Sequence, residues 1–191
     1  MANLTKKAIA ESVTRLLEKK PLDKITIKEI TDDCGMTRNT FYYHFKDIYD
    51  LCTWIFITQA DHIIGKHRGE EEWAEGFREG LNYLYEHKRM MRHVYDSINR
   101  GDLDVYLAQV ISSYAMELIE PRAEMLGVSE DAKKLAAEFY RNAFVAKVLG
   151  WINDDMNIAP DALARMCEHM FRGTIEGALR SAQEVIEDLQ N

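Results

Sequence analysis

The sequence has few of the residues that end helices or cross-link a chain. Its 191 residues include three prolines and ten glycines, and no stretch is rich in both. Because turns between short strands depend on these residues, their scarcity favours long helices over an all-β fold. The three cysteines, Cys34, Cys52 and Cys167, lie far apart and in no paired motif. We therefore expect free and mostly buried thiols.

Long apolar runs and catalytic motifs are also missing. No apolar run approaches the roughly 20 residues that span a bilayer, and the first residues lack the apolar block of a secretory signal. We therefore expect a cytoplasmic protein with no membrane partner. There is no glycine-rich phosphate loop, nucleophile elbow or His-Glu-x-x-His motif, and no His or Cys pair has the spacing of zinc ligands. The sequence therefore predicts no enzyme activity, no cofactor and no metal.

The charge is acidic overall but unevenly distributed. The formal net charge is -8 at pH 7. Residues 1–50 carry nine Lys and Arg against eight Asp and Glu, whereas the remaining residues carry 15 against 24. Acidic groups more than about 10 Å from a phosphate backbone are largely screened by salt. The net charge is therefore compatible with DNA binding by the nearly neutral N-terminal quarter.

Helical periodicity dominates the sequence. Apolar residues recur at intervals of three and four, and no segment sustains the two-residue period of a strand. We expect an all-α fold of about nine helices, over approximately 4–17, 26–34, 37–45, 47–65, 70–86, 88–99, 102 onward with breaks at Pro121 and Gly127, 129–153, and 160 to nearly 191. Three of these helices end within residues 1–50, and the remaining ones extend over residues 51–191.

Two short helices between Thr26 and Phe45 have the boundaries of a helix-turn-helix. Thr26 with Glu29 three residues later is a capping-box pattern that begins a helix. Gly35 can adopt the left-handed backbone of a tight turn, and Thr37 can cap the next helix. The residues expected to pack these helices together are Ile30, Met36, Phe41 and Phe45.

The second of these helices leaves polar and aromatic side chains on an outer face. In a helix-turn-helix this helix enters the major groove, where Arg suits guanine, Asn suits adenine and Tyr hydroxyls reach phosphates. The amide and hydroxyl of Thr26 are also placed at a helix N-terminus, which favours a phosphate. The candidate DNA-binding residues are Thr26, Lys28, Thr37, Arg38, Asn39, Thr40, Tyr42, Tyr43, His44 and Lys46. The alternative is a helical corner whose aromatic residues only pack in a core.

The run Thr40-Phe41-Tyr42-Tyr43-His44-Phe45-Lys46-Asp47 favours DNA binding. With this run, the entry Ile25-Thr26-Ile27-Lys28-Glu29-Ile30 and Gly35, the segment from about Leu4 to Leu51 resembles the DNA-binding domain of the TetR (tetracycline-repressor-like) family. The resemblance implies a homodimer with a DNA-binding domain of three helices at residues 1–50, followed by a linking fourth helix. It also implies a divergent helical bundle at 51–191 that usually binds a small inducer and forms the dimer. It also implies DNA contacts by Thr26, Thr37, Arg38, Asn39, Tyr42, Tyr43, His44 and Lys46.

Two details qualify this resemblance. Asn39 stands where small residues or proline are frequent in the family, so a base preference is not carried over. Residues 45–55 more weakly resemble the subgroup of dihydroxyacetone kinase regulators.

The final predicted helix carries a long apolar stripe, and the helix before it carries more apolar surface than one buried face requires. One helix-turn-helix covers only a half-site, so such proteins usually pair across a palindrome. The glycines in the final helix, four residues apart, permit close approach of a second helix. The predicted dimer interface comprises Phe144, Val148, Trp151, Met170, Gly173, Gly177 and Ala178. The alternative is a bundle packed wholly within one chain.

The middle of the chain is rich in aromatic residues and histidine. A mostly apolar pocket with a few polar groups can be built from such residues. The candidate effector-pocket residues are Trp54, His62, Phe77, His87, Tyr95, Tyr106 and Tyr114. The alternative is that these side chains are ordinary core.

Together these patterns predict a DNA-binding transcriptional regulator, a repressor that binds a palindromic operator as a homodimer. The expected partners are double-stranded DNA, a second copy of the chain, and a small-molecule effector or protein co-regulator that releases or modulates it. Such a ligand acts only if it binds one spacing of the recognition helices better than another. The alternatives are an activator of the same fold that works through a protein partner, and a helical protein-interaction adaptor without DNA binding.

Overall fold

The computed structural model describes residues 2–67, 72–97 and 100–190. Within these residues the chain forms nine α-helices, one 3-10 turn and no strand, which confirms the predicted all-α fold. The elements are α1 (Ala2–Leu17), η1 (Leu22–Lys24), α2 (Ile27–Asp33), α3 (Arg38–His44), α4 (Ile48–Lys66), α5 (Trp73–Glu86), α6 (Lys88–Ser97), α7 (Arg100–Leu126), α8 (Glu130–Asn153) and α9 (Pro160–Gln190).

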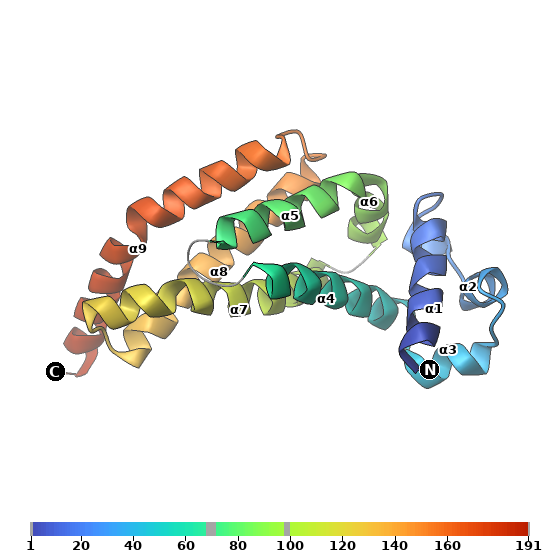
Figure 1. Ribbon diagram of the computed structural model, residues 1–191, viewed down its shortest axis with the longest axis horizontal. Helices are drawn as coiled ribbons and strands as arrows, with labels where there is room; N and C mark the ends of the chain where they lie inside the picture. Colours follow the sequence, from blue (N-terminus) through green and yellow to red (C-terminus); the bar gives the residue numbers. More distant parts are fainter. Residues whose placement is uncertain (1, 68–71, 98–99, 191) are drawn as a thin grey trace.

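The first three helices form a separate unit at one end of an elongated molecule (Figure 1). In α1 the side chains of Ile9, Val13 and Leu17 recur at helical spacing and are almost completely buried. The buried Ser12 hydroxyl donates to the main-chain carbonyl of Ile30 in α2 across 2.9 Å. This bond and the apolar stripe of α1 hold α2 against α1, so the two short helices rest on a longer one.

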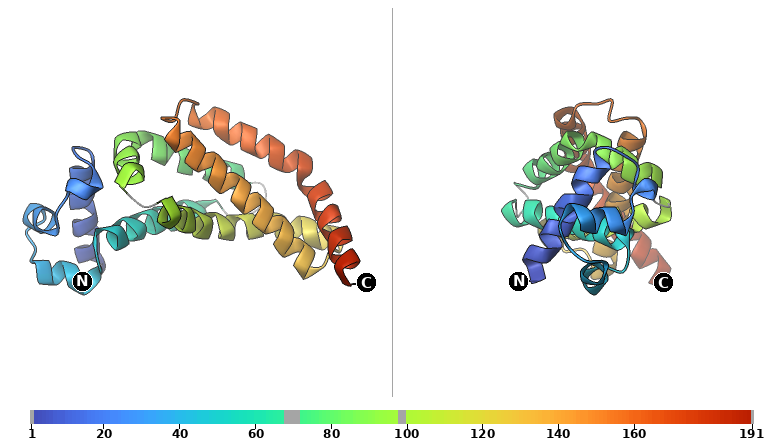
Figure 2. Two further views of the ribbon diagram at one scale, coloured as in Figure 1. Left: turned by 180° about the vertical axis from the view of Figure 1, so that it is seen from behind. Right: turned by 90° about the vertical axis from the view of Figure 1, so that its right-hand side faces the viewer.

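Helix α4 links this unit to the rest of the molecule (Figures 1 and 2). Its start is fixed by two hydrogen bonds of Asp50, whose amide donates to the Asp47 carboxylate at 2.8 Å and whose carboxylate accepts from the Lys46 amide at 2.9 Å. Leu51 and Cys52 are buried near the start of α4, and Ile63 is buried near its end. A single helix therefore contributes to both cores.

The remaining helices pack as a C-terminal bundle, with α7 against α8, α8 against α9, and α5 against α9 (Figure 2). Its core contains an aromatic cluster in which the rings of Tyr140 and Phe171 lie 5.1 Å apart and those of Trp73 and Phe171 lie 5.3 Å apart. Such tilted and edge-to-face ring pairs add to the stabilisation from burial. No helix in the described ranges combines the length and the apolarity needed to cross a membrane.

Helix α7 differs from the sequence prediction because it continues through Pro121. Proline removes one main-chain hydrogen bond and costs a helix interior about 3 kcal/mol. Pro121 itself is exposed, but Leu118, Ile119 and Ala123 around it are buried. Burial of these neighbours outweighs the local cost, so the predicted break at Pro121 is wrong.

The predicted break at Gly127 is confirmed. Gly127 has a φ of 63°, which an L side chain adopts only at a cost. Its amide donates to the carbonyl of Glu124 at 3.1 Å, and the Val128 amide donates to that of Ala123 at 3.2 Å. These two bonds form the Schellman motif that ends many helices. Ser129 then caps α8 and Pro160 begins α9, as predicted.

Candidate DNA-binding surface and cavity

Short-range bonds fix the turn between α2 and α3. Gly35 has a φ of 69°, and the amide of Met36 donates to the Thr31 carbonyl across 2.8 Å. Thr26 and Glu29 form the predicted capping box at the start of α2. Thr37 caps α3 by accepting a bond from the Thr40 amide at 3.1 Å. The predicted boundaries of both short helices are therefore confirmed.

The inner face of α3 is anchored by Phe41 and Phe45, both buried. Phe45 also contacts Trp54 of α4, with 5.8 Å between the ring centres. The ammonium group of Lys6 in α1 lies 5.4 Å from the centre of the Phe45 ring, within the range of a cation–π interaction. Phe45 thus connects the end of α3 to α1 and α4, and α3 packs against α2, as predicted for the packing residues.

The outer face of α3 presents large side chains to solvent. Tyr42 is 58% exposed and Tyr43 is 83% exposed. Arg38, Asn39 and Lys46 are exposed beside them, whereas Thr40 and His44 are partly buried. In the described part of the chain neither Arg38 nor Lys46 forms an ion pair, so both charges are available to phosphates or bases. Two exposed tyrosines beside free cations form a surface suited to the DNA backbone and major groove.

Lys28 and Thr37 lie beside this face with local partners of their own. Lys28 is exposed and pairs with Asp32 at 2.6 Å on the same helix. Because exposed pairs of this kind are weak, the pairing leaves the ammonium group able to contact a phosphate. The Thr37 hydroxyl caps α3 and is also within 2.9 Å of the Thr40 hydroxyl.

The groups of Thr26 that were expected to bind a phosphate are engaged in the capping box. The amide and the hydroxyl of Thr26 both donate to one Glu29 carboxylate oxygen at 2.9 Å. The Lys20 ammonium lies 2.6 Å from the other oxygen. The hydrogen bond from Lys20 and then those from Thr26 lower the pKa of Glu29 to about 2. An ionised carboxylate therefore occupies both groups, so the expectation that they bind a phosphate is not supported by this geometry.

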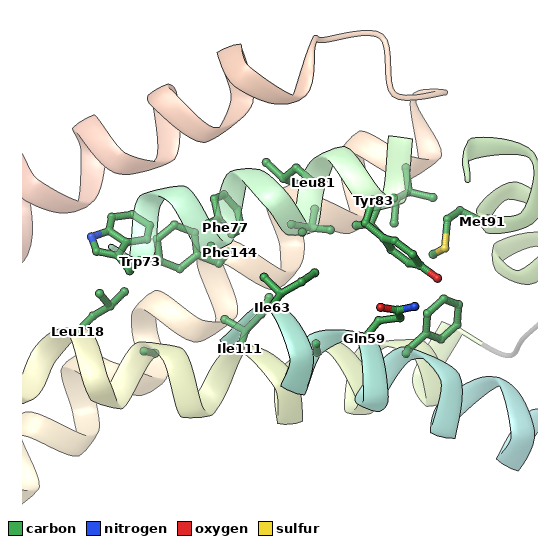
Figure 3. A pocket seen from close by; sticks show the side chains of 18 residues that line it. Gln59, Ile63, Trp73, Phe77, Leu81, Tyr83, Met91, Ile111, Leu118 and Phe144 are labelled. Carbon is green, nitrogen blue, oxygen red and sulfur yellow. The ribbon is translucent and has the colours of Figure 1, made fainter. Parts of the chain in front are cut away.

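A cavity of about 130 Å³ lies in the C-terminal bundle, between residues of α4, α5, α6, α7 and α8 (Figure 3). Its walls include Phe56, Gln59, Trp73, Phe77, Tyr83 and Phe144. The Gln59 amide and the Tyr83 hydroxyl point toward each other from α4 and α5 at one end (Figure 3). Burial raises the pKa of Tyr83 against a smaller opposing effect of its hydrogen bond with Gln59. The Tyr83 hydroxyl therefore stays protonated at neutral pH.

The predicted pocket residues mostly lie elsewhere. Phe77 lines the cavity. Trp54 and His87 instead line a second hollow of about 470 Å³ between the N-terminal unit and α4 and α5. His62 is exposed and Tyr95 is partly buried against the core. The side chains of Tyr106 and Tyr114 lie outside the described part of the structure.

The predicted residues that lie away from the cavity do so because contacts between residues distant in the sequence set the position of each side chain. Trp54 is drawn to the domain junction because its ring packs on Phe45, and the Lys6 ammonium lies 5.5 Å from its centre. Gln59 was missed because it and Thr58 are the only two polar residues in the run Ile55-Phe56-Ile57-Thr58-Gln59-Ala60. Its spacing from Phe56 and Ile63, three and four residues, is the only sign in the sequence that it shares their buried face.

The predicted dimer residues divide into two groups. Phe144, Val148 and Trp151 are buried within their own chain, and the Trp151 indole donates to the Ile158 carbonyl at 2.8 Å. These three predictions are corrected, because the side chains already face the core of the bundle. Met170 is 64% exposed. Gly173 and Gly177 are also exposed, and Ala178 is partly buried.

Exposed apolar side chains and two exposed glycines of α8 and α9 define a further surface, which we call the α8–α9 face. It comprises Leu135, Phe139, Met166, Met170, Gly173 and Gly177. The two helices pack against each other, and the Tyr140 hydroxyl lies 2.7 Å from the Thr174 hydroxyl across them. A chain that exposes several large apolar side chains on neighbouring helices has a surface suited to a protein partner.

No group of three or more His, Cys, Asp or Glu residues within the described ranges has an arrangement that could hold a metal ion. The cysteines are free, with Cys52 and Cys167 buried and Cys34 partly buried. The chemistry of the molecule therefore concentrates at the outer face of α3 and in the cavity.

Comparisons with known proteins agree with this architecture. Residues 3–52 match the family model described as bacterial regulatory proteins, tetR family, and residues 71–173 match a model described as transcriptional regulator C-terminal region. A comparison with curated proteins gives no match.

Two solved structures share the fold along most of the chain. The dihydroxyacetone kinase operon activator DhaS is similar with a TM-score of 0.71 and 17% identity, over 90% of this chain and 96% of that chain. A TetR transcriptional regulator from Streptococcus agalactiae 2603V is similar with a TM-score of 0.60 and 17% identity, over 88% of this chain and 94% of that chain. At 17% identity, these similarities show a shared fold.

Proposed function

The chain belongs to the TetR family of transcriptional regulators, and we propose that it binds a palindromic operator as a homodimer and responds to a small molecule in its cavity. Membership of this family makes it a DNA-binding regulator and not an enzyme. The finer parts of the proposal are the residues that contact DNA, the dimer, the effector and the direction of regulation.

The outer face of α3 gives the main support for DNA binding. Tyr42 and Tyr43 are exposed, with Arg38, Asn39 and Lys46 exposed next to them. The backbone beneath is fixed by the turn at Gly35 and by the buried inner face. A fixed helix that presents these side chains can place them against base edges and phosphates without first becoming ordered, which lowers the cost of binding.

The α8–α9 face supports the proposed homodimer. Phe139 is 66% exposed and Met170 is 64% exposed, and an added Cβ at Gly173 or Gly177 meets no atom within 4 Å of the same chain. Two copies that meet through this face would bury the apolar side chains, and the glycines would let the helices approach closely. Pairing also supplies the second recognition helix that a palindrome requires.

The position of the cavity supports control by a small molecule. Gln59 and Tyr83 line both the cavity and the hollow that separates α4 and α5 from the N-terminal unit. The Tyr83 ring contacts the His87 ring, with 4.6 Å between centres, and His87 lies 3.9 Å from Glu18, just after α1. A ligand that displaces Tyr83 would therefore alter contacts with the DNA-binding unit. It controls DNA binding only if it prefers one of the two arrangements.

Repression is the direction we propose, because a dimer on an operator blocks access to the DNA that it covers. Activation is the second candidate, favoured by the similarity to a protein described as an operon activator. A reporter promoter that carries the selected site separates the two. Expression falls on addition of the protein if it represses and rises if it activates.

Selection of duplexes from a random-sequence pool tests the DNA-binding proposal. We expect enriched sites with two inverted half-sites, and an affinity that falls about 10³- to 10⁵-fold between 50 and 200 mM salt if six to ten phosphates are contacted. Enrichment of single half-sites would contradict the homodimer. Absence of any enriched sequence would contradict operator recognition.

A further inference from the structure

We infer that the cavity selects a small, uncharged, single-ring aromatic molecule that carries one hydrogen-bonding group, such as a phenol, and rejects carboxylates and polyols. The inference rests on the cavity and names the ligand class of the proposed effector site. It is independent of whether the ligand changes operator affinity.

The size of the cavity limits the ligand. A volume of about 130 Å³ is close to that of an engineered apolar protein cavity of about 150 Å³ that binds benzene. One six-membered ring with a small substituent fills such a space. A molecule with two fused rings and further substituents requires the walls to move.

The walls are apolar and aromatic. Among the described lining residues none is charged, and the aromatic ones come from α4, α5 and α8. The Phe77 and Phe144 rings lie 5.6 Å apart, and Trp73 and Phe144 lie 6.2 Å apart. These distances match favourable aromatic packing, so a ligand ring would find ring faces and edges around it. A carboxylate would lose its hydration without gaining a counter-charge, and a polyol would leave most hydroxyls unpaired.

Gln59 and Tyr83 gather at one end of the cavity, whereas the Trp73 indole, whose N–H has no hydrogen-bond partner among the described residues, lies at the other (Figure 3). Figure 3 shows the Gln59 amide and the Tyr83 hydroxyl facing each other at the first end, with Ile63 and Phe77 farther along the cavity. A hydroxyl and an amide can each donate and accept. A single ligand hydroxyl placed between them can therefore donate to one group and accept from the other, while the ring lies against the apolar walls.

Calorimetric titration of the full-length protein at pH 7 tests this selectivity with four probes: p-cresol, toluene, benzoate and dihydroxyacetone. We expect p-cresol to bind most tightly and toluene to bind about 2- to 10-fold more weakly, as one lost hydrogen bond implies. Benzoate and dihydroxyacetone should give no measurable binding at the same concentrations. Tighter binding of either than of p-cresol would overturn the inference.

Two variants locate the binding. Gly80 lines the cavity and an added Cβ there meets no atom within 4 Å, so Gly80→Leu should fill the space and weaken p-cresol binding at least about 10-fold. The matched control is Gly65→Leu, at an exposed position of α4 that is equally open. Tyr83→Phe should remove most of the difference between p-cresol and toluene. Unchanged p-cresol binding in both cavity variants would overturn the inference.

Operator affinity measured in the same samples keeps the two proposals apart. Binding of p-cresol that Gly80→Leu abolishes, without any change in operator affinity, supports the ligand class and contradicts the effector role. A change in operator affinity that persists in Gly80→Leu contradicts the cavity as the site of that ligand.

Discussion

His93 on α6 donates a hydrogen bond from Nδ1 to the main-chain carbonyl of Leu17 at the end of α1, across 2.6 Å. A carbonyl oxygen only accepts, so the ring nitrogen that faces it carries the proton. The last carbonyls of a helix have no partner within the helix, and here the C-terminal bundle supplies one. The two domains are therefore joined by a specific contact as well as by α4.

Substitution His93→Ala should loosen this junction. Loss of one half-buried hydrogen bond costs about 1 kcal/mol of unfolding free energy, and amide exchange should accelerate in α6 and in the last turn of α1. Denaturant unfolding and hydrogen exchange measure both effects. The control is His62→Ala, at an exposed histidine of α4. Equal stability and exchange in the two variants would show that the His93 contact does not join the domains.

Gly35 and Gly80 should respond to alanine with opposite signs. At Gly35 the φ is 69° and an added Cβ meets nothing within 4 Å, so Gly35→Ala carries a purely conformational cost of about 1–2 kcal/mol. Gly80 lies within α5 and is equally open, so Gly80→Ala should stabilise by about 0.5–1 kcal/mol. Thermal unfolding measures both. Stabilisation by both substitutions would contradict the assigned turn.

The capping box should make α2 sensitive to acid. The folded-state pKa of Glu29, about 2, lies below its ordinary value of 4.5 because Lys20 and Thr26 hydrogen-bond the carboxylate. Its contribution is therefore complete above about pH 4.5 and is lost as the pH falls toward 2. The stability difference between the parent and Glu29→Gln should shrink across that range. A difference that stays constant from pH 6 to pH 2 would contradict the ionised capping box.

The α8–α9 face should fail as an interface when it gains a charge. We expect the parent protein to be a dimer, with twice the chain mass of 22.1 kDa. Met170→Arg should yield monomers with the mass of one chain, because the arginine would be buried in the interface without a partner. Met125→Arg on α7 is the matched control, since both methionines are 64% exposed. Analytical ultracentrifugation distinguishes them. Dissociation by Met125→Arg alone would place the interface elsewhere.

Features set by short-range chemistry could be predicted from the sequence. The capping box at Thr26, the glycine turn at Gly35 and the caps at Thr37 and Ser129 depend on residues only a few positions apart. The buried and exposed sides of α3 could also be predicted, because helical spacing assigns each residue to one face of the helix.

Features set by distant neighbours could not be predicted. Pro121 stays helical because buried residues around it pack on other helices. Phe144 belongs to an apolar face that periodicity identified, but only the fold shows that this face meets Trp73 and Phe171 of the same chain. The pairing of Gln59 with Tyr83, 24 positions later, likewise arises from how α4 and α5 pack.

The affinity of Arg38→Ala and Tyr42→Ala for the selected operator tests the central claim most directly. Arg165→Ala, at an exposed arginine of α9, is the control. At about 0.1 M salt each α3 variant should bind about 5- to 150-fold more weakly, as loss of a DNA contact worth about 1–3 kcal/mol implies, with unchanged mass and helical content. The control should bind as the parent does. Parental affinity in both α3 variants would contradict the assignment of α3 as the recognition helix.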